Sequence, residues 1–189
     1  MLSFSPITLQ NAATLRPYLG AQSFRTCDYT LGAVFQWRAY LHSSFAIAEN
    51  QLIMRATYPG DGEYFVYPVG AGDVSAALDA IEAYAAESGA KLCFCAVPEA
   101  GMEVLRARYG DRATISTHRD WADYLYNASD LIDFPGKKYH TQRNHLNRFL
   151  KDNPSAVFVP VTEETLPNAV AFLDEYEHHV PLDKVIEAE

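Results

Sequence analysis

The sequence predicts an α+β fold, a mixed α/β domain in which helices cover a central mixed sheet. Three observations lead to this fold class. Apolar residues recur at helical spacing in several segments, and strand-like segments rich in aromatic and β-branched residues lie between them. A strand, glycine turn, helix and strand then follow strands that are expected to be antiparallel. This order favours a mixed sheet over a doubly wound sheet with regular alternation.

The first 70 residues predict two helices followed by three strands. The helices are expected over residues 9–19, with Thr8 as the N-cap, and over residues 31–41. The strands, with turns at residues 49–50 and 59–62, are expected over residues 45–48, 51–57 and 63–69.

A βαβ unit comes next. Gly70-Ala71-Gly72-Asp73 forms a turn, and the following helix over residues 74–88 ends at Gly89. The remaining expected elements of this half are a buried strand over residues 91–97, a helix over residues 99–109, and a strand or hairpin over residues 114–127.

The composition is typical of a globular protein, because 49% of the 189 residues are hydrophobic and 21% are charged. The sequence contains no run of about 18 apolar residues and no basic, apolar signal at its start. We therefore expect neither an integral membrane segment nor a secretory signal. Three cysteines are too few for a disulfide framework in a chain of this size, which favours a cytoplasmic location.

Gly70 and Gly72 leave two interpretations open for the turn before the long helix. Backbone N–H groups at a helix N-terminus attract phosphate, which makes the turn a candidate ligand loop for a phosphate or an acyl carrier. The turn lacks the Lys-Ser/Thr pair of a P-loop and the third glycine of the dinucleotide fingerprint. An ordinary tight turn, with Asp73 capping the helix, is the favoured interpretation.

Cys93 and Cys95 are two residues apart in an expected strand, so both side chains lie on one face. We interpret them as core residues, because neither zinc-ligand spacing nor a local nucleophile motif accompanies them. His178 and His179 lie beside acidic residues, but adjacent side chains on a helix diverge by about 100 degrees. We expect a solvated helix end there and no metal site in the chain.

One short segment is basic in an otherwise acidic chain. The net charge is −9, with 15 Lys and Arg residues against 24 Asp and Glu residues. Residues 137–151 hold five of the cations and no acid, which leaves ten cations against the 24 acids elsewhere. The charge distribution argues against a nucleic-acid footprint over the whole surface and concentrates any such footprint in this segment.

The basic segment is expected to form an amphipathic helix from Gly136 onward. Tyr139 and Leu146 belong to its apolar positions, and the cations spread over the remaining surface. Lys137 and Lys138 oppose the helix dipole at its N-terminus, a cost that a nearby anion would relieve. Two interpretations stay open: the cations pack on the acidic body of the protein, or they bind phosphate or nucleic acid.

Several motifs surround this helix. They are Arg119 with Asp123-Tyr124-Leu125-Tyr126, the turn from Leu131 to His140, and the run from Gln142 to Phe149. Shorter matches lie at Asp28-Tyr29-Thr30, Gln36-Trp37-Arg38 and Pro68-Val69-Gly70. On these residues the chain resembles the phosphatidylglycerol lysyltransferase C-terminal domain family, including its soluble relatives of unknown function. The resemblance runs through nearly the whole chain.

The resemblance implies a tandem pair of acetyltransferase-like (GNAT) domains, of which this chain holds the first half. Residues 1–135 would form a GNAT-like domain, and residues 136–189 the basic connecting helix and the start of a second, truncated GNAT-like domain. Family members with known activity move an aminoacyl group from aminoacyl-tRNA to a lipid or peptide acceptor, without a metal or cofactor. The implied partners are tRNA and either the missing second half or another copy of the chain.

The resemblance also implies the candidate residues for binding substrate or phosphate. The cations among them would hold tRNA phosphates, and Tyr139 and His140 would stack on the donor or hydrogen-bond to it. Arg119 and Asp123 are expected to form an internal pair that supports the turn together with Tyr124, and no catalytic residue is assigned. The candidates for binding are Lys137, Lys138, Tyr139, His140, Arg143, Asn144 and Arg148.

Two other functions compete with aminoacyl transfer. A non-catalytic binding or regulatory module would use the basic helix to dock a partner, and apolar surface along Phe149, Phe172 and Tyr176 would then be exposed. An acyl-CoA-dependent N-acetyltransferase would instead bind acyl-CoA at the turn that begins at Gly70.

Overall fold

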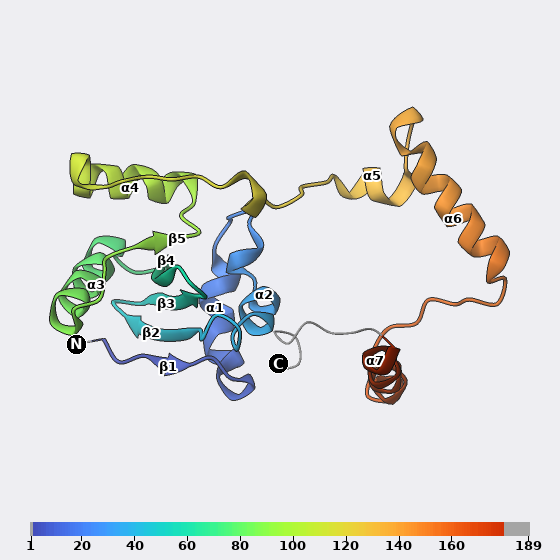
Figure 1. Cartoon of the computed structure of the whole chain (residues 1–189), viewed down its shortest axis with the longest axis horizontal. Coiled ribbons are helices and arrows are strands. Elements are labelled where there is room, and N and C mark those ends of the chain that lie inside the picture. The colour runs from blue at the N-terminus through green and yellow to red at the C-terminus, as the bar shows by residue number, and fades with distance from the viewer. Residues whose placement is uncertain (1, 180–189) are drawn as a thin grey trace. The chain divides into compact units, whose positions relative to one another are not determined.

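The computed structural model describes residues 2–179 and contains two compact units (Figure 1). The described residues up to Asp120 form the first unit, and those from Trp121 onward form the second. The boundary between the compact units lies between Asp120 and Trp121, and the division at residues 135–136 that the resemblance implies stays a prediction. The short helix α5 (Ala128–Asp133) therefore groups with the basic helix that follows it.

The first unit contains a five-stranded sheet in the order β1-β2-β3-β4-β5. Neighbouring strands pair in antiparallel fashion from β1 to β4, and β5 runs parallel to β4. This topology confirms the predicted mixed sheet and the α+β class. The strands span Ser5–Pro6 (β1), Ser44–Ala48 (β2), Gln51–Tyr58 (β3), Gly62–Gly70 (β4) and Phe94–Cys95 (β5).

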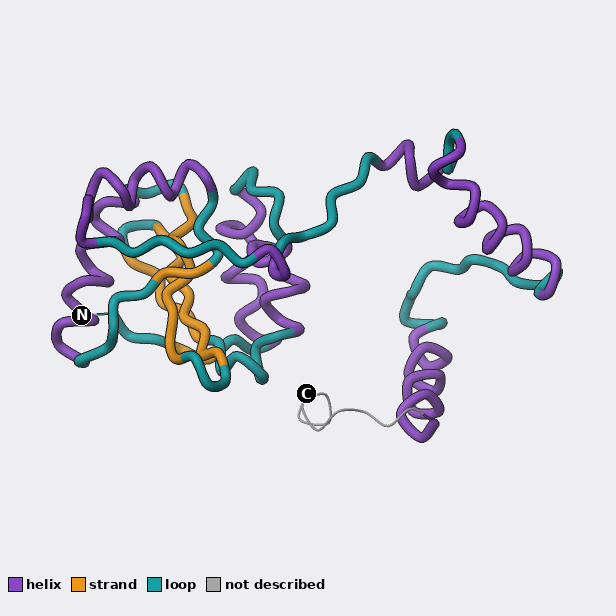
Figure 2. Tube along the Cα trace, turned by 45° about the horizontal axis from the view of Figure 1, so that its top comes forward, coloured by secondary structure: helices purple, strands orange, loops and turns teal. Residues whose placement is uncertain are grey.

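Helices pack on both faces of this sheet (Figure 2). They span Ala12–Ala21 (α1), Leu31–Gln36 (α2), Val74–Ser88 (α3) and Glu99–Tyr109 (α4), with 3-10 turns at Leu9–Asn11, Cys27–Tyr29 and Gly110–Arg112. Leu15 of α1 belongs to the same buried cluster as Met54 of β3. Ile81 of α3 and Leu105 of α4 join Ile53 in a second cluster. Successive residues of β3 enter different clusters because side chains alternate between the faces of a strand.

The β2–β3 hairpin turns at Glu49 and Asn50, as predicted. Both residues have left-handed backbone angles, with φ of 52° and 55°. Two such residues form the tight turn whose twist suits a two-residue hairpin. The turn fixes the register in which Ala48 lies opposite Gln51.

The helices α3 and α4 begin and end where the sequence predicts. The Asp73 carboxylate caps α3 by accepting a hydrogen bond from the Ser75 N–H at 2.8 Å. Gly89 ends α3 in the left-handed conformation, with φ of 71°. These local signals explain why the bounds could be predicted without knowledge of the packing.

Two predicted elements of the first unit are shorter than expected. The helix expected over residues 31–41 ends at Gln36, and the strand expected over residues 91–97 is reduced to Phe94–Cys95. Ala96 ends this strand, because its φ of 49° lies outside the extended region.

The strand or hairpin expected over residues 114–127 is wrong. This segment contains the 3-10 turn Arg119–Trp121 and otherwise irregular backbone. An alternating sequence becomes a strand only where a neighbouring strand pairs with its backbone N–H and C=O groups. No strand of the described residues pairs with this segment.

The second unit consists of helices joined by irregular backbone. None of its described side chains is buried, and all buried apolar residues that the structure describes lie between Leu2 and Leu105. Among the described helices, none combines the length and the apolar character that a membrane span needs. After α5 the helical elements are a 3-10 turn at Lys137–Tyr139, α6 (His140–Asp152) and α7 (Leu166–His179). The position of α6 confirms the predicted basic helix.

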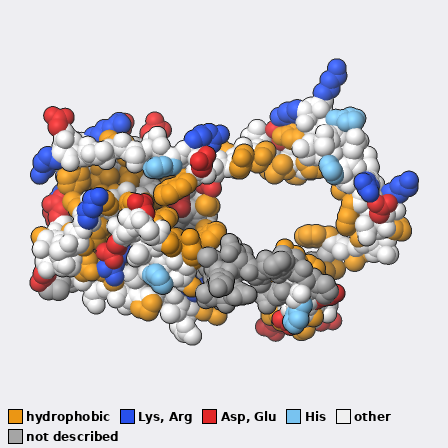
Figure 3. All heavy atoms as spheres, in the orientation of Figure 1, with side chains coloured by type: hydrophobic (Ala, Val, Ile, Leu, Met, Phe, Trp, Pro, Cys, Tyr) orange, Lys and Arg blue, Asp and Glu red, His pale blue; other side chains and the backbone are white. Residues whose placement is uncertain are grey.

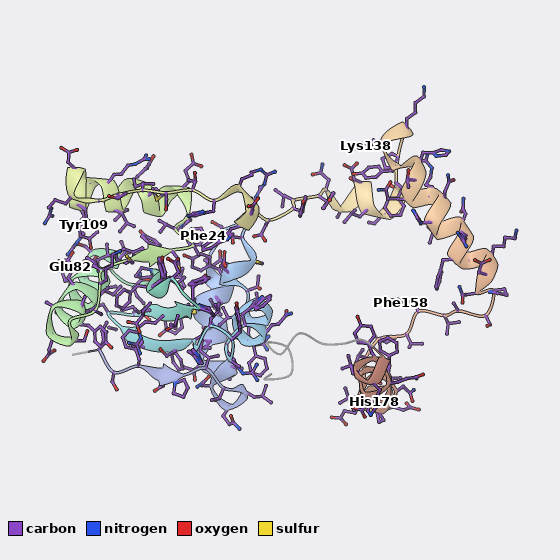
Figure 4. All side chains as sticks on the ribbon, viewed as in Figure 1. Phe24, Glu82, Tyr109, Lys138, Phe158 and His178 are labelled. Carbon is purple, nitrogen blue, oxygen red and sulfur yellow. The ribbon has the colours of Figure 1, made fainter. Side chains whose placement is uncertain are left out.

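Arg108 of α4 forms an ion pair with Glu82 of α3, and Glu82 is labelled in Figure 4 beside Tyr109. Its Nε donates a hydrogen bond to Glu82 Oε1 at 2.7 Å, and a second guanidinium nitrogen pairs with Asp79. The Tyr109 hydroxyl donates to the same Glu82 oxygen at 2.7 Å. The hydrogen bond from Arg108 is the main reason why the pKa of Glu82 lies below its usual value. This cluster fastens together the two helices that cover one face of the sheet.

Candidate functional site

The α5–α6 corner is the best-defined polar arrangement of the second unit. Phe134 and Gly136 reverse the chain there with positive φ angles of 45° and 71°. Arg143 reaches back from α6 and donates hydrogen bonds from Nη1 to the carbonyl oxygens of both residues, with 2.8 Å to that of Gly136. The guanidinium thus satisfies carbonyl groups that α5 and the turn leave unpaired.

Asp130 of α5 forms the second part of this corner. Its Oδ2 accepts a hydrogen bond from Lys138 Nζ at 3.1 Å and another from the Tyr139 hydroxyl at 3.2 Å. The Lys138 ammonium also lies 4.7 Å from the centre of the Tyr139 ring. The hydrogen bond from Lys138 is the main cause that lowers the pKa of Asp130, and the same bond raises the pKa of Lys138. We refer to Asp130, Lys138, Tyr139 and Arg143 as the corner clamp.

For three other candidate residues, the polar contacts that the structure describes lie within α6. His140 Nδ1 lies 3.2 Å from Asn144 Nδ2, one turn away. Arg148 Nε lies 3.5 Å from an Asp152 carboxylate oxygen, and the Arg148 side chain is 83% exposed. An exposed pair of this kind contributes about 0–1 kcal/mol and leaves the guanidinium accessible.

Lys137 and Lys151 lie near the two ends of the basic segment. Neither forms an ion pair with any side chain that the structure describes. Cationic side chains gather over the 3-10 turn and α6 in Figure 3. These two lysines are therefore the cations of the segment most available to an external anion.

The structure thus divides the predicted binding residues into two groups. Lys138, Tyr139 and Arg143 lie together at the corner and have partners within the chain, which supports the interpretation of an intramolecular role. The others have exposed side chains, Lys137 in the 3-10 turn before α6 and His140, Asn144 and Arg148 along α6. Binding of phosphate or tRNA by either group stays a prediction. Sequence reasoning missed Asp130, whose only signal was an acid eight residues before Lys138.

The predicted supporting residues lie outside this corner. Arg119 belongs to the 3-10 turn at residues 119–121, and Asp123 follows in irregular backbone. Tyr124 is 85% exposed and its ring stacks on that of Tyr126, with centroids 6.5 Å apart. The pairing of Arg119 with Asp123 stays a prediction.

The glycine turn of the first unit packs against the β2–β3 hairpin. The Gly72 N–H donates to the Asn50 carbonyl at 3.2 Å, and Gln51 Nε2 donates to the Gly72 carbonyl at 2.6 Å. A Cβ atom at Gly72 would lie 1.7 Å from the Glu49 carbonyl oxygen, and one at Gly70 would lie 2.3 Å from that of Asn50. Close backbone approach therefore explains both glycines without a ligand.

Tyr29 connects β4 to the residue that follows β5. This fully buried residue donates a hydrogen bond from its hydroxyl to the Ala96 carbonyl at 2.8 Å, and the Tyr67 carbonyl lies 3.3 Å from the same hydroxyl. Burial raises the pKa of the Tyr29 hydroxyl well above its usual value, so the residue stays a neutral donor. The Tyr29 side chain is thus a structural link between β4 and the segment after β5.

The cysteines follow the predicted pattern in part. Cys95 is buried, and burial is the main cause that raises the pKa of its thiol to about 12, so it is a poor nucleophile. Cys93 is partly buried, and Cys27 is exposed. Within the described residues, no group of three or more His, Cys, Asp and Glu side chains is arranged to hold a metal ion.

A profile of the family described as "Phosphatidylglycerol lysyltransferase, C-terminal" matches residues 22–179. The chain belongs to this family. The matched range contains the β2–β5 sheet, the corner clamp and α6. Family membership confirms the resemblance seen in the sequence and relates the chain broadly to lysyltransferases.

One solved structure is similar over most of this chain. It is described as a conserved protein of unknown function from Bacteroides thetaiotaomicron VPI-5482, with 28% sequence identity and a TM-score of 0.80. The similarity covers 93% of this chain and 59% of that chain, so this chain spans less than two thirds of its relative. No curated protein matches the sequence significantly.

Substitution of Gly72 tests the packing role of the glycine turn. We expect Gly72→Ala to destabilise the protein by about 2 kcal/mol or more, because the new methyl group collides with backbone. Gly20→Ala is the control, since that helical position has open space and should gain about 0.5 kcal/mol. Thermal unfolding of both variants checks this prediction. An unchanged melting temperature for Gly72→Ala would contradict it.

The corner clamp predicts a perturbed titration. The Asp130 carboxyl should titrate below the usual range in carbon-detected NMR, and Lys138→Gln should move its pKa upward toward the ordinary value. Because this pKa is lowered, the stabilisation exists at neutral pH and is lost as the pH falls through the carboxyl titration. Lys137→Gln removes a neighbouring charge without removing the hydrogen bond, so it should leave the pKa nearly unchanged. Equal shifts of the Asp130 pKa in Lys138→Gln and Lys137→Gln would refute a specific contact between Asp130 and Lys138.

Proposed function

We propose that the chain forms part of an aminoacyltransferase that moves an aminoacyl group from aminoacyl-tRNA to a lipid or to another amine or hydroxyl acceptor. Membership of the lysyltransferase-related family is the observation that carries this proposal. The basic segment supports it, because it concentrates five cations of an acidic chain on one helix and its preceding turn. Since charged tRNA is a cytoplasmic molecule, we also propose a cytoplasmic location for the chain.

The proposed reaction requires no covalent intermediate on the protein. The acceptor nitrogen or oxygen attacks the ester carbonyl, a new C–N or C–O bond forms, and the bond to the ribose oxygen breaks. The acceptor proton leaves and the ribose oxygen gains a proton, so the step is balanced without a redox cofactor. Positioning of the two substrates and stabilisation of the oxyanion each contribute several kcal/mol to reactions of this kind.

In this proposal α6 holds the nucleic acid while the corner clamp fixes its N-terminal end. Lys137, in the 3-10 turn, and Lys151, in the last turn of α6, would lie roughly 20 Å apart, which is enough to reach separate phosphates. Arg148 adds a third accessible cation between them. Tyr139 and Arg143 act within the fold, so their loss would disturb α6 through its support.

The remaining part of the transfer site is proposed to lie outside this chain. Phe149, Phe172 and Tyr176 are 53%, 63% and 47% exposed, and Phe158, labelled in Figure 4, is 99% exposed. Apolar side chains exposed in such number are typical of surfaces that another domain or subunit covers. We assign this surface to a second GNAT-like half or to another copy of the chain, with residues 1–135 acting as a first GNAT-like half. The 59% coverage of the solved relative supports this division.

A non-catalytic binding module is the second candidate function, and the same exposed apolar surface favours it. An acyl-CoA-dependent N-acetyltransferase has less support. The Gly72 N–H already donates to the Asn50 carbonyl, and the backbone of Glu49 and Asn50 lies close to both glycines of the turn. An acyl-CoA would have to displace these contacts.

The proposal predicts salt-dependent tRNA binding through α6. We expect the double variant Lys137→Gln/Lys151→Gln to weaken binding of lysylated tRNA and to reduce the slope of log K against log salt by about one to two. The control variant Lys91→Gln/Arg106→Gln removes the same charge from the first unit. Filter binding over a range of salt concentrations measures both slopes.

The possible results separate the two candidate functions. A reduced slope for the α6 variant alone supports tRNA binding at this helix. Equal slopes for the wild type and both variants would contradict the nucleic-acid part of the proposal and favour the binding module. Uncharged tRNA serves as a further comparison, because phosphate contacts alone should not distinguish it from lysylated tRNA.

A further inference from the structure

The first unit contains a cavity of about 90 Å³ between α2 and the sheet. Ala33 and Val34 line it from α2, and Met54 and Val66 line it from the sheet. Trp37 also lines the cavity and is 46% exposed, so the cavity opens to the surface. It lies close to the carboxyl end of β5, the side of a parallel strand pair at which α/β proteins often bind ligands.

Neutral polar groups form the inner wall of the cavity. The Tyr58 hydroxyl and the Cys95 thiol both line the cavity. Burial, followed by the charge of Asp28, raises the pKa of the thiol to about 12 and keeps it protonated at neutral pH. The pKa of Tyr58 is also raised, chiefly by burial. Neither group therefore carries a charge that would attract or repel an ionic ligand.

Asp28 is the one carboxylate among the described residues that line the cavity. It is exposed, and its Oδ2 accepts a hydrogen bond from the Thr26 hydroxyl at 2.5 Å. A carboxylate can accept further hydrogen bonds beside this one. Its influence on the groups of the inner wall indicates that the negative potential of Asp28 reaches into the cavity.

Arg55 also lines the cavity, but its guanidinium has partners elsewhere. One of its nitrogens lies 3.2 Å from a Glu63 oxygen and donates to the Tyr84 hydroxyl at 2.6 Å. The guanidinium carbon lies 4.1 Å from the centre of the Phe4 ring, and both Phe4 and Tyr84 pack in the cluster on the α3 face of the sheet. The Arg55 guanidinium therefore has its partners on the α3 face of the sheet, whereas Met54 and Val66 line the cavity on the other face.

We propose that this cavity binds a small organic ammonium ion, with Asp28 pairing with the charge and the apolar walls enclosing its alkyl part. Trp37 also lines the cavity, and the aromatic rings of such residues attract cations. Anionic ligands are disfavoured by the unopposed carboxylate. A cavity of about 150 Å³ can hold benzene, so we expect the enclosed part to be smaller, about four carbon atoms long. This proposal concerns the first unit alone and does not depend on aminoacyl transfer.

Three probes of similar shape test the proposal: n-butylammonium, 1-butanol and butyrate. We expect n-butylammonium to shift the NMR signals of the Val34, Val66 and Met54 methyl groups in a saturable manner. 1-Butanol should bind more weakly, and butyrate should not bind. Equal affinity for n-butylammonium and 1-butanol would overturn the assignment of charge recognition. Absence of saturable shifts with n-butylammonium would overturn the cavity as a binding site.

Variants distinguish recognition by Asp28 from general attraction to an acidic protein. Asp28→Asn keeps the shape and the acceptor for Thr26, and it should weaken n-butylammonium binding about tenfold or more. Asp111→Asn makes the same charge change at a residue that does not line the cavity. The affinity of this variant for n-butylammonium should match that of the wild type. Equal losses in both variants would overturn the specific role of Asp28.

A filled cavity provides an independent test that does not alter charge. Ala33→Leu adds a larger side chain to the wall, and it should abolish binding of n-butylammonium and 1-butanol alike. The melting temperature and the methyl spectrum of the free variant establish that it is folded. Retained n-butylammonium binding by the folded Ala33→Leu variant would place the binding site elsewhere and contradict the proposal.

Discussion

Burial of apolar side chains is the constraint on which this structure depends. The first unit satisfies it, because the two faces of one sheet are covered by α1 and α2 on one side and by α3 and α4 on the other. The described side chains of the second unit are all partly or fully exposed. Secondary structure in the second unit therefore depends on local hydrogen bonds and on whatever covers its apolar surface, since short helices gain most of their stability from packing.

In the corner clamp, polar contacts rather than a buried apolar core hold neighbouring elements of the second unit together. Arg143 and Asp130 connect α5, the turn and α6. Arg143 was predicted from the sequence to bind phosphate, and Asp130 was not predicted to have a role. This use of the same cations for support explains how a helix can begin with lysines against its own dipole. It also leaves the outer cations of α6 available, which is what a surface for an anionic polymer requires.

Elements whose determining signals are local could be predicted from the sequence. Asp73 and Gly89 mark the ends of α3, and the left-handed pair Glu49-Asn50 makes the hairpin. The absence of a strand over residues 114–127 of the described chain could not be predicted, because alternation does not reveal whether a partner strand exists. The hydrogen bond of the Tyr29 hydroxyl and that of the Arg55 guanidinium could not be predicted, since each involves a partner distant in sequence. The packing of Gly72 against Glu49 is long-range in the same way.

Amide hydrogen exchange tests the central claim that one unit carries the core. At low protein concentration, amides of α3 should exchange only through global unfolding, whereas those of α6 and α7 should exchange orders of magnitude faster through local opening. Protection of α6 and α7 that rises with protein concentration would identify another copy of the chain as the cover of their apolar surface. Protection of α6 and α7 equal to that of α3 at every concentration would contradict the account, because it would require a core within the second unit.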